Sequence, residues 1–157
     1  AFPDRVATAP LLQKMVERGR LGQKVGKGFF DYGPTKAGRP PRGTDSAEVA
    51  ALMAECRTGT PRKLSKDEII DRLFLPMLLE ATRALEDKLV RDVRDVDLAL
   101  IFGIGFPPFR GGLFFWADEI GTGQIGEKLK QYSALGKRYE PTAMLTKLAQ
   151  QNGKFYD

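Results

Sequence analysis

Apolar side chains recur every three or four residues along most of the chain, and this spacing predicts helices. The clearest run begins at Ser65-Lys66-Asp67-Glu68, which has the spacing of a helix capping box, with Leu64 and Ile69 placed to pack across the helix start. The apolar period continues to about Leu89 through Ile69, Ile70, Leu73, Met77, Leu78, Ala81 and Leu85. We therefore expect one long helix over residues 65–89.

Shorter helices are predicted on both sides of the long one, each bounded by a capping residue or a glycine. Before it, the pattern favours helices over residues 10–18 and 46–57. After it, the pattern favours helices over 96–102 (capped by Asp95), 113–120, 125–135 and 143–151. No useful length of sequence shows the period-two alternation of a sheet, so the predicted fold class is all-α.

A tight turn separates two of these helices, because residues 103–112 hold two prolines and several glycines. Aromatic residues gather around this turn within fifteen positions: Phe102, Phe106, Phe109, Phe114, Phe115 and Trp116. The cluster has two interpretations, as part of the core or as an apolar substrate wall or subunit contact. The second makes Phe102, Phe106 and Phe109 candidate substrate-binding residues.

The composition limits which chemical groups this chain can use. The 157 residues are 42% hydrophobic and 29% charged, which is ordinary for one compact domain. There is one cysteine, Cys56, so no disulfide can form within the chain, and an inert thiol is expected there. The chain contains no histidine, which removes the Ser-His and Cys-His nucleophile pairs and the usual zinc ligands. No run approaches the ~18 apolar residues of a membrane span, so a soluble, cytoplasmic protein is expected.

The net charge of +5 is unevenly distributed. Residues 1–63 hold 12 Lys and Arg against 6 Asp and Glu, whereas residues 64–157 hold 13 against 14. The basic residues that interleave with Gly and Pro are Arg18, Arg20, Lys24, Lys27, Lys36, Arg39 and Arg42. They predict a solvated basic loop or, as the alternative, a nucleic-acid-binding module, although no helix-turn-helix, zinc or RNA-recognition signature accompanies them.

Two further motifs are given structural interpretations. Residues 121–126 match G-x-G-x-x-G, but a dinucleotide site needs a preceding strand and here a helix is predicted, so we expect a turn between helices. A group of carboxylates has no calcium-loop spacing and is expected to supply helix caps and solvated faces. Its members are Glu86, Asp87, Asp92, Asp95 and Asp97.

The two ends of the chain echo each other at an offset of 133 residues. Arg5, Leu12 and Lys14 recur as Arg138, Leu145 and Lys147. Both segments then close on aromatic residues, at 26–32 and 152–157. The echo predicts two copies of one helical unit, the first present only at its C-terminal end.

The glycine-rich segment 21–32 resembles the end of the first C-terminal domain of 3-hydroxyacyl-CoA dehydrogenases. Residues 67–112, with Asp67-Glu68-Ile69-Ile70-Asp71-Arg72 and Gly105-Phe106-Pro107-Pro108-Phe109-Arg110-Gly111-Gly112, resemble the second such domain in the multifunctional α-subunit of the bacterial fatty-acid oxidation complex. The likeness covers residues 8–32 and 64–157. Two copies of this helical domain in the family would account for the echo.

The resemblance implies a domain organisation and a role. It implies that residues 1–63 hold the end of the first copy, a basic linker and a short helix, and that residues 64–157 form the complete second copy. The parent would oxidise 3-hydroxyacyl-CoA with NAD in fatty-acid β-oxidation, as a dimer or in a larger complex with a thiolase subunit. Phe102 falls where relatives often have a tyrosine near the acyl-CoA site.

The family's catalytic His and Glu and its NAD-binding domain have no counterpart in this sequence, so the resemblance implies no cofactor or catalytic residue within this chain. We therefore expect a C-terminal fragment for substrate binding and dimerisation that is not catalytic alone. Two alternatives stay open from the residues themselves: the basic nucleic-acid-binding module, which is not favoured, and a purely structural helical interaction domain.

Overall fold

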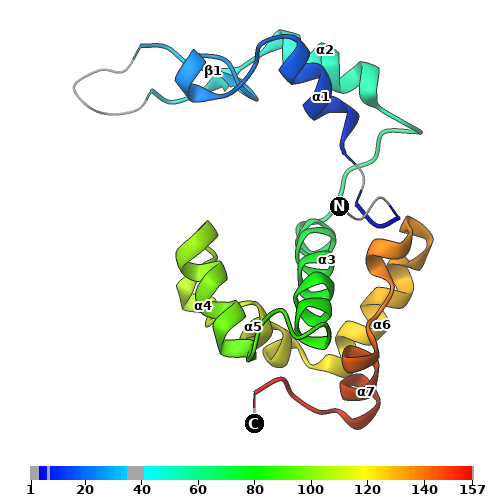
Figure 1. Cartoon of the computed structure of the whole chain (residues 1–157). Coiled ribbons are helices and arrows are strands. Elements are labelled where there is room, and N and C mark those ends of the chain that lie inside the picture. Colours follow the sequence, from blue (N-terminus) through cyan, green and yellow to red (C-terminus); the bar gives the residue numbers. More distant parts are fainter. Residues whose placement is uncertain (1–3, 7, 35–40, 157) are drawn as a thin grey trace. The chain divides into compact units, whose positions relative to one another are not determined.

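A computed structural model describes residues 4–6, 8–34 and 41–156 of the chain. The chain divides into two compact units, one of residues 1–5 with 64–157 and the other of residues 6–63. Helices dominate the described residues of both (Figure 1). The predicted all-α class is confirmed. The only strands among these described residues are two residues long, β1 (Phe30–Asp31) and β2 (Thr44–Asp45), and they pair antiparallel.

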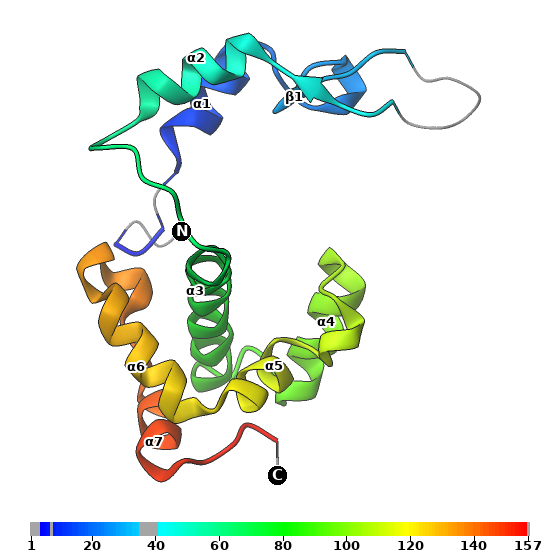
Figure 2. The same cartoon turned by 180° about the vertical axis from the view of Figure 1, so that it is seen from behind.

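The larger unit is a layer of helices arranged around α3. In Figures 1 and 2, α3 lies between α4 on one side and α6 on the other, with α5 and α7 crossing near one end. Short 3₁₀ turns join several of these helices. The elements are α3 (Lys66–Glu86), α4 (Val93–Ile104), η2 (Pro108–Arg110), α5 (Leu113–Ile120), α6 (Thr122–Tyr132), η3 (Ser133–Leu135), η4 (Lys137–Tyr139) and α7 (Ala143–Gln151).

The long helix begins where its capping box predicts. Ser65 Oγ accepts a hydrogen bond from the Glu68 amide at 3.1 Å, which satisfies one of the free donors of the first turn. The helix continues through Pro76 and ends at Glu86, three residues before the predicted end. Lys88 has a positive φ of 57° just after it, so the backbone has already left the helical region by Leu89.

Two helix starts differ from the predictions, each by three residues. Helix α4 begins at Val93 because Asp92, and not Asp95, is the cap: its Oδ1 accepts from the Arg94 amide at 2.9 Å. Helix α6 begins at Thr122, so the glycine motif 121–126 forms the first turns of a helix instead of a separate turn. The predicted bounds of α5 and α7 are confirmed.

The core of the larger unit lies between α3 and the helices that follow it. Twelve residues there are at most 4% exposed: Leu75, Leu78, Leu79, Phe106, Leu113, Phe114, Trp116, Ala117, Ile125, Leu129, Tyr139 and Leu145. Burial of such apolar side chains is the main stabilising contribution to a fold of this size. No helix in the described part of the chain is long and apolar enough to span a bilayer.

The smaller unit packs α1 (Pro10–Glu17) against α2 (Ala47–Cys56), with the turn η1 (Gln23–Val25) and the ribbon β1–β2 beyond them. Its polar centre is Arg20, whose side chain is 1% exposed. The guanidinium donates to Asp31 at 2.6 Å, to Glu48 at 3.0 Å and to the Gly28 carbonyl at 2.9 Å. The pKa of the Asp31 carboxyl lies below its usual value, mainly because this carboxylate accepts the hydrogen bond from Arg20.

At Arg20, these contacts show that the prediction of a solvated basic loop is wrong. Arg20 is buried and paired because two carboxylates and a carbonyl replace its hydration. Arg18 also lies 3.8 Å from Glu48, and Lys14 pairs with Glu55 at 2.7 Å. Lys36 and Arg39 lie outside the described residues. Part of the basic charge is therefore neutralised within the unit, which weakens the nucleic-acid alternative.

Candidate functional site

The aromatic cluster around residues 102–116 is split between the core and the surface. Phe106 is 4% exposed, and its ring centroid lies 5.3 Å from that of Phe74. Phe74 in turn meets the edge of Trp116 at 5.2 Å, and Phe114 is fully buried against Phe155. The structure thus places Phe106 inside the helical layer, where its contacts are those of a core residue.

Phe102 and Phe109 are the other two candidate substrate-binding residues, and both lie on the surface. Each is 84% exposed, and Ile104 and Leu98, which are close to Phe102 in the sequence, are 68% and 52% exposed. The Arg110 guanidinium lies 5.9 Å from the centre of the Phe109 ring. A hollow of about 570 Å³ adjoins the turn, with Phe74, Phe109 and Trp116 among its lining residues. The turn therefore presents apolar surface beside a concavity.

A buried carboxylate from α4 fixes the position of this turn. Asp97 is 2% exposed, and its two oxygens accept from the backbone amides of Phe114 and Phe115 at 2.9 and 3.2 Å. These amides are in the first turn of α5, where donors have no partner within the helix. Since Gly112 at the helix start has no side chain to serve as a cap, Asp97 supplies the cap from the neighbouring helix.

The glycine at position 112 makes room for that carboxylate. Its φ is +126°, and a Cβ built there would overlap the side chain of Asp97. Only glycine combines this backbone conformation with such a close approach. Gly112 is thus required by the contact between α4 and α5, whereas Gly111, with a φ of +74°, is required because a Cβ there would overlap the Phe115 side chain.

The last described residues return across α5 and complete the same network. Asp118 accepts from the amides of Phe155 (2.8 and 3.1 Å) and Tyr156 (2.9 Å). The Thr122 hydroxyl donates to the Gly153 carbonyl at 2.7 Å. The Tyr156 hydroxyl donates to Asp97 at 2.8 Å. We call residues 153–156 the C-terminal strap. It links Asp97, the carboxylate that caps α5, to Asp118 within α5 and to Thr122 at the start of α6.

The strap leads to a prediction for alkaline pH. Burial, followed by the hydrogen bond to Asp97, raises the pKa of the Tyr156 hydroxyl well above its usual value of about 10. Because the folded-state pKa is the higher one, the stability from this group is complete below pH ~10 and is lost as the pH rises toward the folded value. The absorbance of tyrosinate, compared between the wild type and Tyr156→Phe, should show this one hydroxyl ionising above pH 10. A difference curve centred at or below pH 10 would contradict the contact.

The sequence placed Asp97 only in a group of carboxylates expected to supply helix caps and solvated faces, and did not show that Asp97 caps α5. One signal pointed further: the residue before the helix predicted over 113–120 is a glycine, which has no side chain that could cap the helix as Ser, Thr, Asp or Asn would. A helix start without its own cap requires a partner for its amides from elsewhere. Of the other predicted carboxylates, Glu86 accepts from the Met144 amide in the first turn of α7 at 2.6 Å and so caps a neighbouring helix as Asp97 does, whereas Asp95 pairs with Arg91 at 3.1 Å.

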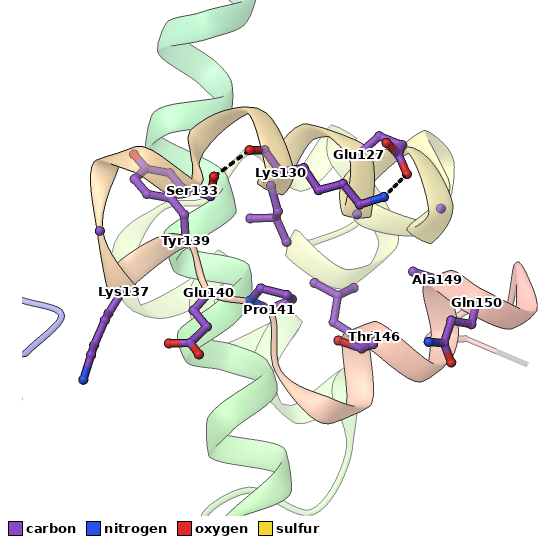
Figure 3. A pocket seen from close by; sticks show the side chains of 15 residues that line it. Glu127, Lys130, Ser133, Lys137, Tyr139, Glu140, Pro141, Thr146, Ala149 and Gln150 are labelled. Atoms are coloured by element: carbon purple, nitrogen blue, oxygen red, sulfur yellow. Dashed lines mark hydrogen bonds and ion pairs between the residues drawn. The ribbon is translucent and has the colours of Figure 1, made fainter.

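A second and larger hollow, of about 760 Å³, lies between α6, η4 and α7 (Figure 3). Leu129, Tyr139 and Leu145 are the buried residues at its base, and Gly126 and Ala149 line it where the two helices approach. A Cβ built at Gly126 would lie 3.4 Å from the Cβ of Ala149, so α6 and α7 pack closely at this point. The glycines of the 121–126 motif are the one indication of this hollow that is visible in the sequence.

The described residues hold no group of three or more His, Cys, Asp or Glu side chains arranged to bind a metal ion. Cys56, at the end of α2, is half-buried and free. The polar groups that converge at the turn are a capping carboxylate and its donors, and they hold backbone in place. The arrangement can shape an apolar surface and a concavity, which suits binding and assembly.

Comparisons with known proteins agree with this architecture. The model of the 3-hydroxyacyl-CoA dehydrogenase C-terminal domain matches residues 69–155. The fatty acid oxidation complex subunits alpha of Pseudomonas paraeruginosa (strain PA7) and Pseudomonas aeruginosa (strain LESB58) are each 38% identical to this chain over 99% of its length. The chain spans 22% of the length of either relative.

A solved structure shares the fold. The dehydrogenase part of multifunctional enzyme 1 from C. elegans matches 90% of this chain and 33% of its own, with a TM-score of 0.61 and 19% sequence identity. The matched family domain, residues 69–155, contains α4, the aromatic turn, α5 and most of the strap that holds them together. Because the family model matches residues 69–155, the chain belongs to the 3-hydroxyacyl-CoA dehydrogenase C-terminal domain family.

Proposed function

We propose that this chain is the helical substrate-binding and dimerisation part of an NAD-dependent 3-hydroxyacyl-CoA dehydrogenase of fatty-acid β-oxidation. The whole protein would oxidise 3-hydroxyacyl-CoA to 3-oxoacyl-CoA and work as a dimer or in a complex with a thiolase subunit. NAD and the reacting groups would be held by a dinucleotide-binding domain that lies outside these 157 residues. On this proposal, the chain alone does not catalyse hydride transfer.

The observation that carries the proposal is the exposure of Phe102 and Phe109 on a backbone that is otherwise tightly held. Phe102 and Phe109 are each 84% exposed, and Leu98 and Ile104 in the same stretch of sequence are exposed as well; large exposed apolar side chains of this kind are covered in a functional assembly. The Asp97 cap and the strap hold the start of α5, which follows directly after the turn. Exposed apolar side chains at a turn that adjoins a concavity support contact with an acyl chain or a second subunit.

The smaller unit is consistent with an incomplete helical copy on this proposal. Leu12 in α1 is 47% exposed, whereas its counterpart in the sequence echo, Leu145 in α7, is fully buried. Val16, Phe29 and Phe30 of the same unit are also between 45% and 62% exposed. These side chains would be covered by the helices of a first copy in the whole protein.

The test combines assembly with ligand response. We expect the wild-type chain to self-associate in light scattering and to unfold at a higher temperature with acetoacetyl-CoA, because ligand bound only by the native state stabilises it. Replacing the two phenylalanines together, Phe102→Ser with Phe109→Ser, should reduce both effects. The double variant removes apolar contact area from the surface and leaves the core unchanged, so its own unfolding temperature should stay within a few degrees.

Leu89→Ser is the matched control, since Leu89 is 76% exposed and precedes the opposite end of α4. It should leave association and ligand response as in the wild type. A monomeric chain with no response to acetoacetyl-CoA would contradict the proposal. Stabilisation by a short DNA duplex alone would favour the nucleic-acid alternative, and self-association without any ligand response would favour the purely structural one.

A further inference from the structure

An ion-pair cluster on α3 holds the segment that precedes the smaller unit. Residues 1–5 belong with residues 64–157 to the larger unit, whereas the smaller unit begins at residue 6. The Arg5 guanidinium donates from Nε to Glu80 Oε1 at 2.7 Å and from Nη2 to Glu80 Oε2 at 3.3 Å. The Arg5 side chain is 18% exposed. Because Asp4 and Arg5 lie outside any helix or strand, this bidentate contact anchors them to the larger unit.

The carboxylate that receives Arg5 is itself held in place. Arg83, three residues further along α3, donates to Glu80 Oε1 at 2.8 Å and to the Glu140 backbone carbonyl at 2.9 Å. These two bonds fix Arg83 between α3 and the segment after η4, so Arg83 orients Glu80 whether or not Arg5 is bound. A preorganised carboxylate loses little side-chain entropy when it binds a guanidinium. Glu80 and Arg83 thus form a receptor for a planar, bidentate donor.

Release of Arg5 does not leave Glu80 unsatisfied. The Glu80 carboxylate keeps its hydrogen bond from Arg83, and its side chain is 41% exposed, so water can hydrate it. The second contact of the segment is a long one, 3.9 Å between Asp4 and Lys137, whose side chain points away from the hollow in Figure 3. Partly exposed ion pairs are weakened by salt and contribute modest stability. The contact can therefore open at high ionic strength while the helices stay folded.

The chain connections give the contact a consequence for the smaller unit. When Arg5 is bound, both ends of the smaller unit lead into residues that the larger unit holds: residue 5 at one end, and residue 64, just before the Ser65 cap of α3, at the other. When Arg5 is released, only the connection at residue 64 remains. Units of one chain move independently unless additional contacts restrain them. The Arg5 contact is such a restraint.

From these features we propose that Glu80 and Arg83 form a guanidinium-binding site on α3 whose ligand is Arg5, and that this contact is a salt-sensitive latch on the smaller unit. In the closed state the latch restricts the rotation of the smaller unit. In the open state the smaller unit moves on one connection. The proposal does not depend on the dehydrogenase assignment, because its residues lie outside the aromatic turn.

Limited trypsin digestion of the full chain measures the latch, because trypsin cleaves after an arginine or lysine only when that side chain can leave its partners. The reference site is Arg57, an exposed residue in the segment that joins the units. We expect the rate after Arg5 relative to Arg57 to rise about fivefold between low salt and 1 M salt, where the Debye length is about 3 Å, since cleavage follows the open population. A ratio that does not change with salt would overturn the proposal.

Two variants open the latch at low salt. Arg5→Lys keeps the charge and the trypsin site but cannot form both hydrogen bonds, and Glu80→Gln removes the charge of the receptor. Each should raise cleavage after residue 5 about fivefold relative to Arg57, as expected for loss of one ion pair of roughly 1 kcal/mol. Arg91→Ala removes an exposed cation that pairs with Asp95, so it is the matched control and should behave as the wild type. Unchanged ratios in both latch variants would overturn the proposal.

Nuclear magnetic relaxation of ¹⁵N measures the effect on the smaller unit. At low salt, we expect the amides of α2 to tumble more slowly in the wild type than in Arg5→Lys or Glu80→Gln, while the amides of α3 change little. Equal α2 relaxation in the wild type and both variants would overturn the latch. The Phe102→Ser with Phe109→Ser variant should keep the wild-type cleavage ratio, so a failure of the proposed function is distinguishable from a failure of this one.

Discussion

Gly112→Ala should destabilise the larger unit by about 2–5 kcal/mol, the sum of two separate costs. The left-handed backbone is unfavourable for alanine by roughly 1–2 kcal/mol. The added methyl group also overlaps Asp97, which must move and leave buried amides of α5 without a partner, at roughly 1–3 kcal/mol. Urea unfolding followed by the fluorescence of Trp116, the single tryptophan and a buried residue of this unit, measures the loss directly.

Gly121→Ala separates the two costs. Gly121 has a φ of +95° between α5 and α6, but a Cβ there would meet nothing within 4 Å. This variant should therefore show the backbone cost alone, about 1–2 kcal/mol. Equal losses for Gly112→Ala and Gly121→Ala would mean that Asp97 does not limit the space at residue 112.

Asp97→Ala is expected to cost about 3–5 kcal/mol, the second large effect. The substitution leaves three donors without their acceptor, two amides of α5 and the Tyr156 hydroxyl, and the loss of each costs roughly 1–3 kcal/mol, partly offset by water that enters the space. The favourable interaction of the carboxylate with the N-terminus of α5 is lost too. The same fluorescence-detected unfolding should show a lower midpoint with an unchanged denaturant slope.

Asp95→Ala is the matched control for Asp97→Ala, since Asp95 lies on the same helix but is paired with exposed Arg91. A change within about 0.5 kcal/mol is expected there. A double-mutant cycle between Asp97→Ala and Tyr156→Phe should yield a coupling of about 1–2 kcal/mol, because the two side chains share one hydrogen bond. Additive effects would show that the strap and the cap are independent.

The helices could be predicted from the sequence where local signals act alone. The Ser65 capping box at the start of α3 and the glycine that ends α5 are signals that act within a few residues. The start of α4 was predicted three residues late because two aspartates compete for the cap and the apolar period does not choose between them. The two-residue strands β1 and β2 are too short to show alternation, so no periodicity could reveal them.

The candidate site was predictable only in part, because its organising contacts join residues far apart in sequence. The aromatic cluster was visible, but the separation of buried Phe106 from exposed Phe102 and Phe109 depends on how η2 turns between α4 and α5. The partners of Asp97 include residues 17 and 59 positions away. Similarly, nothing local marks Arg20 as buried, since its acceptors Asp31 and Glu48 lie 11 and 28 residues further on.

The strap has a consequence for how the protein is made. Its amides and its tyrosine bind Asp118 and Asp97, which are synthesised 37 to 59 residues earlier. Domains begin to fold during synthesis, at roughly 5–20 residues per second. Helix α5 can therefore receive its cap from Asp97 while the chain is still growing, but the rest of the network waits until Tyr156 has left the ribosome. Until then the newly made helices expose the surface of Phe114 that Phe155 will cover, and a nascent chain stalled in this interval is the form most exposed to chaperones and proteases.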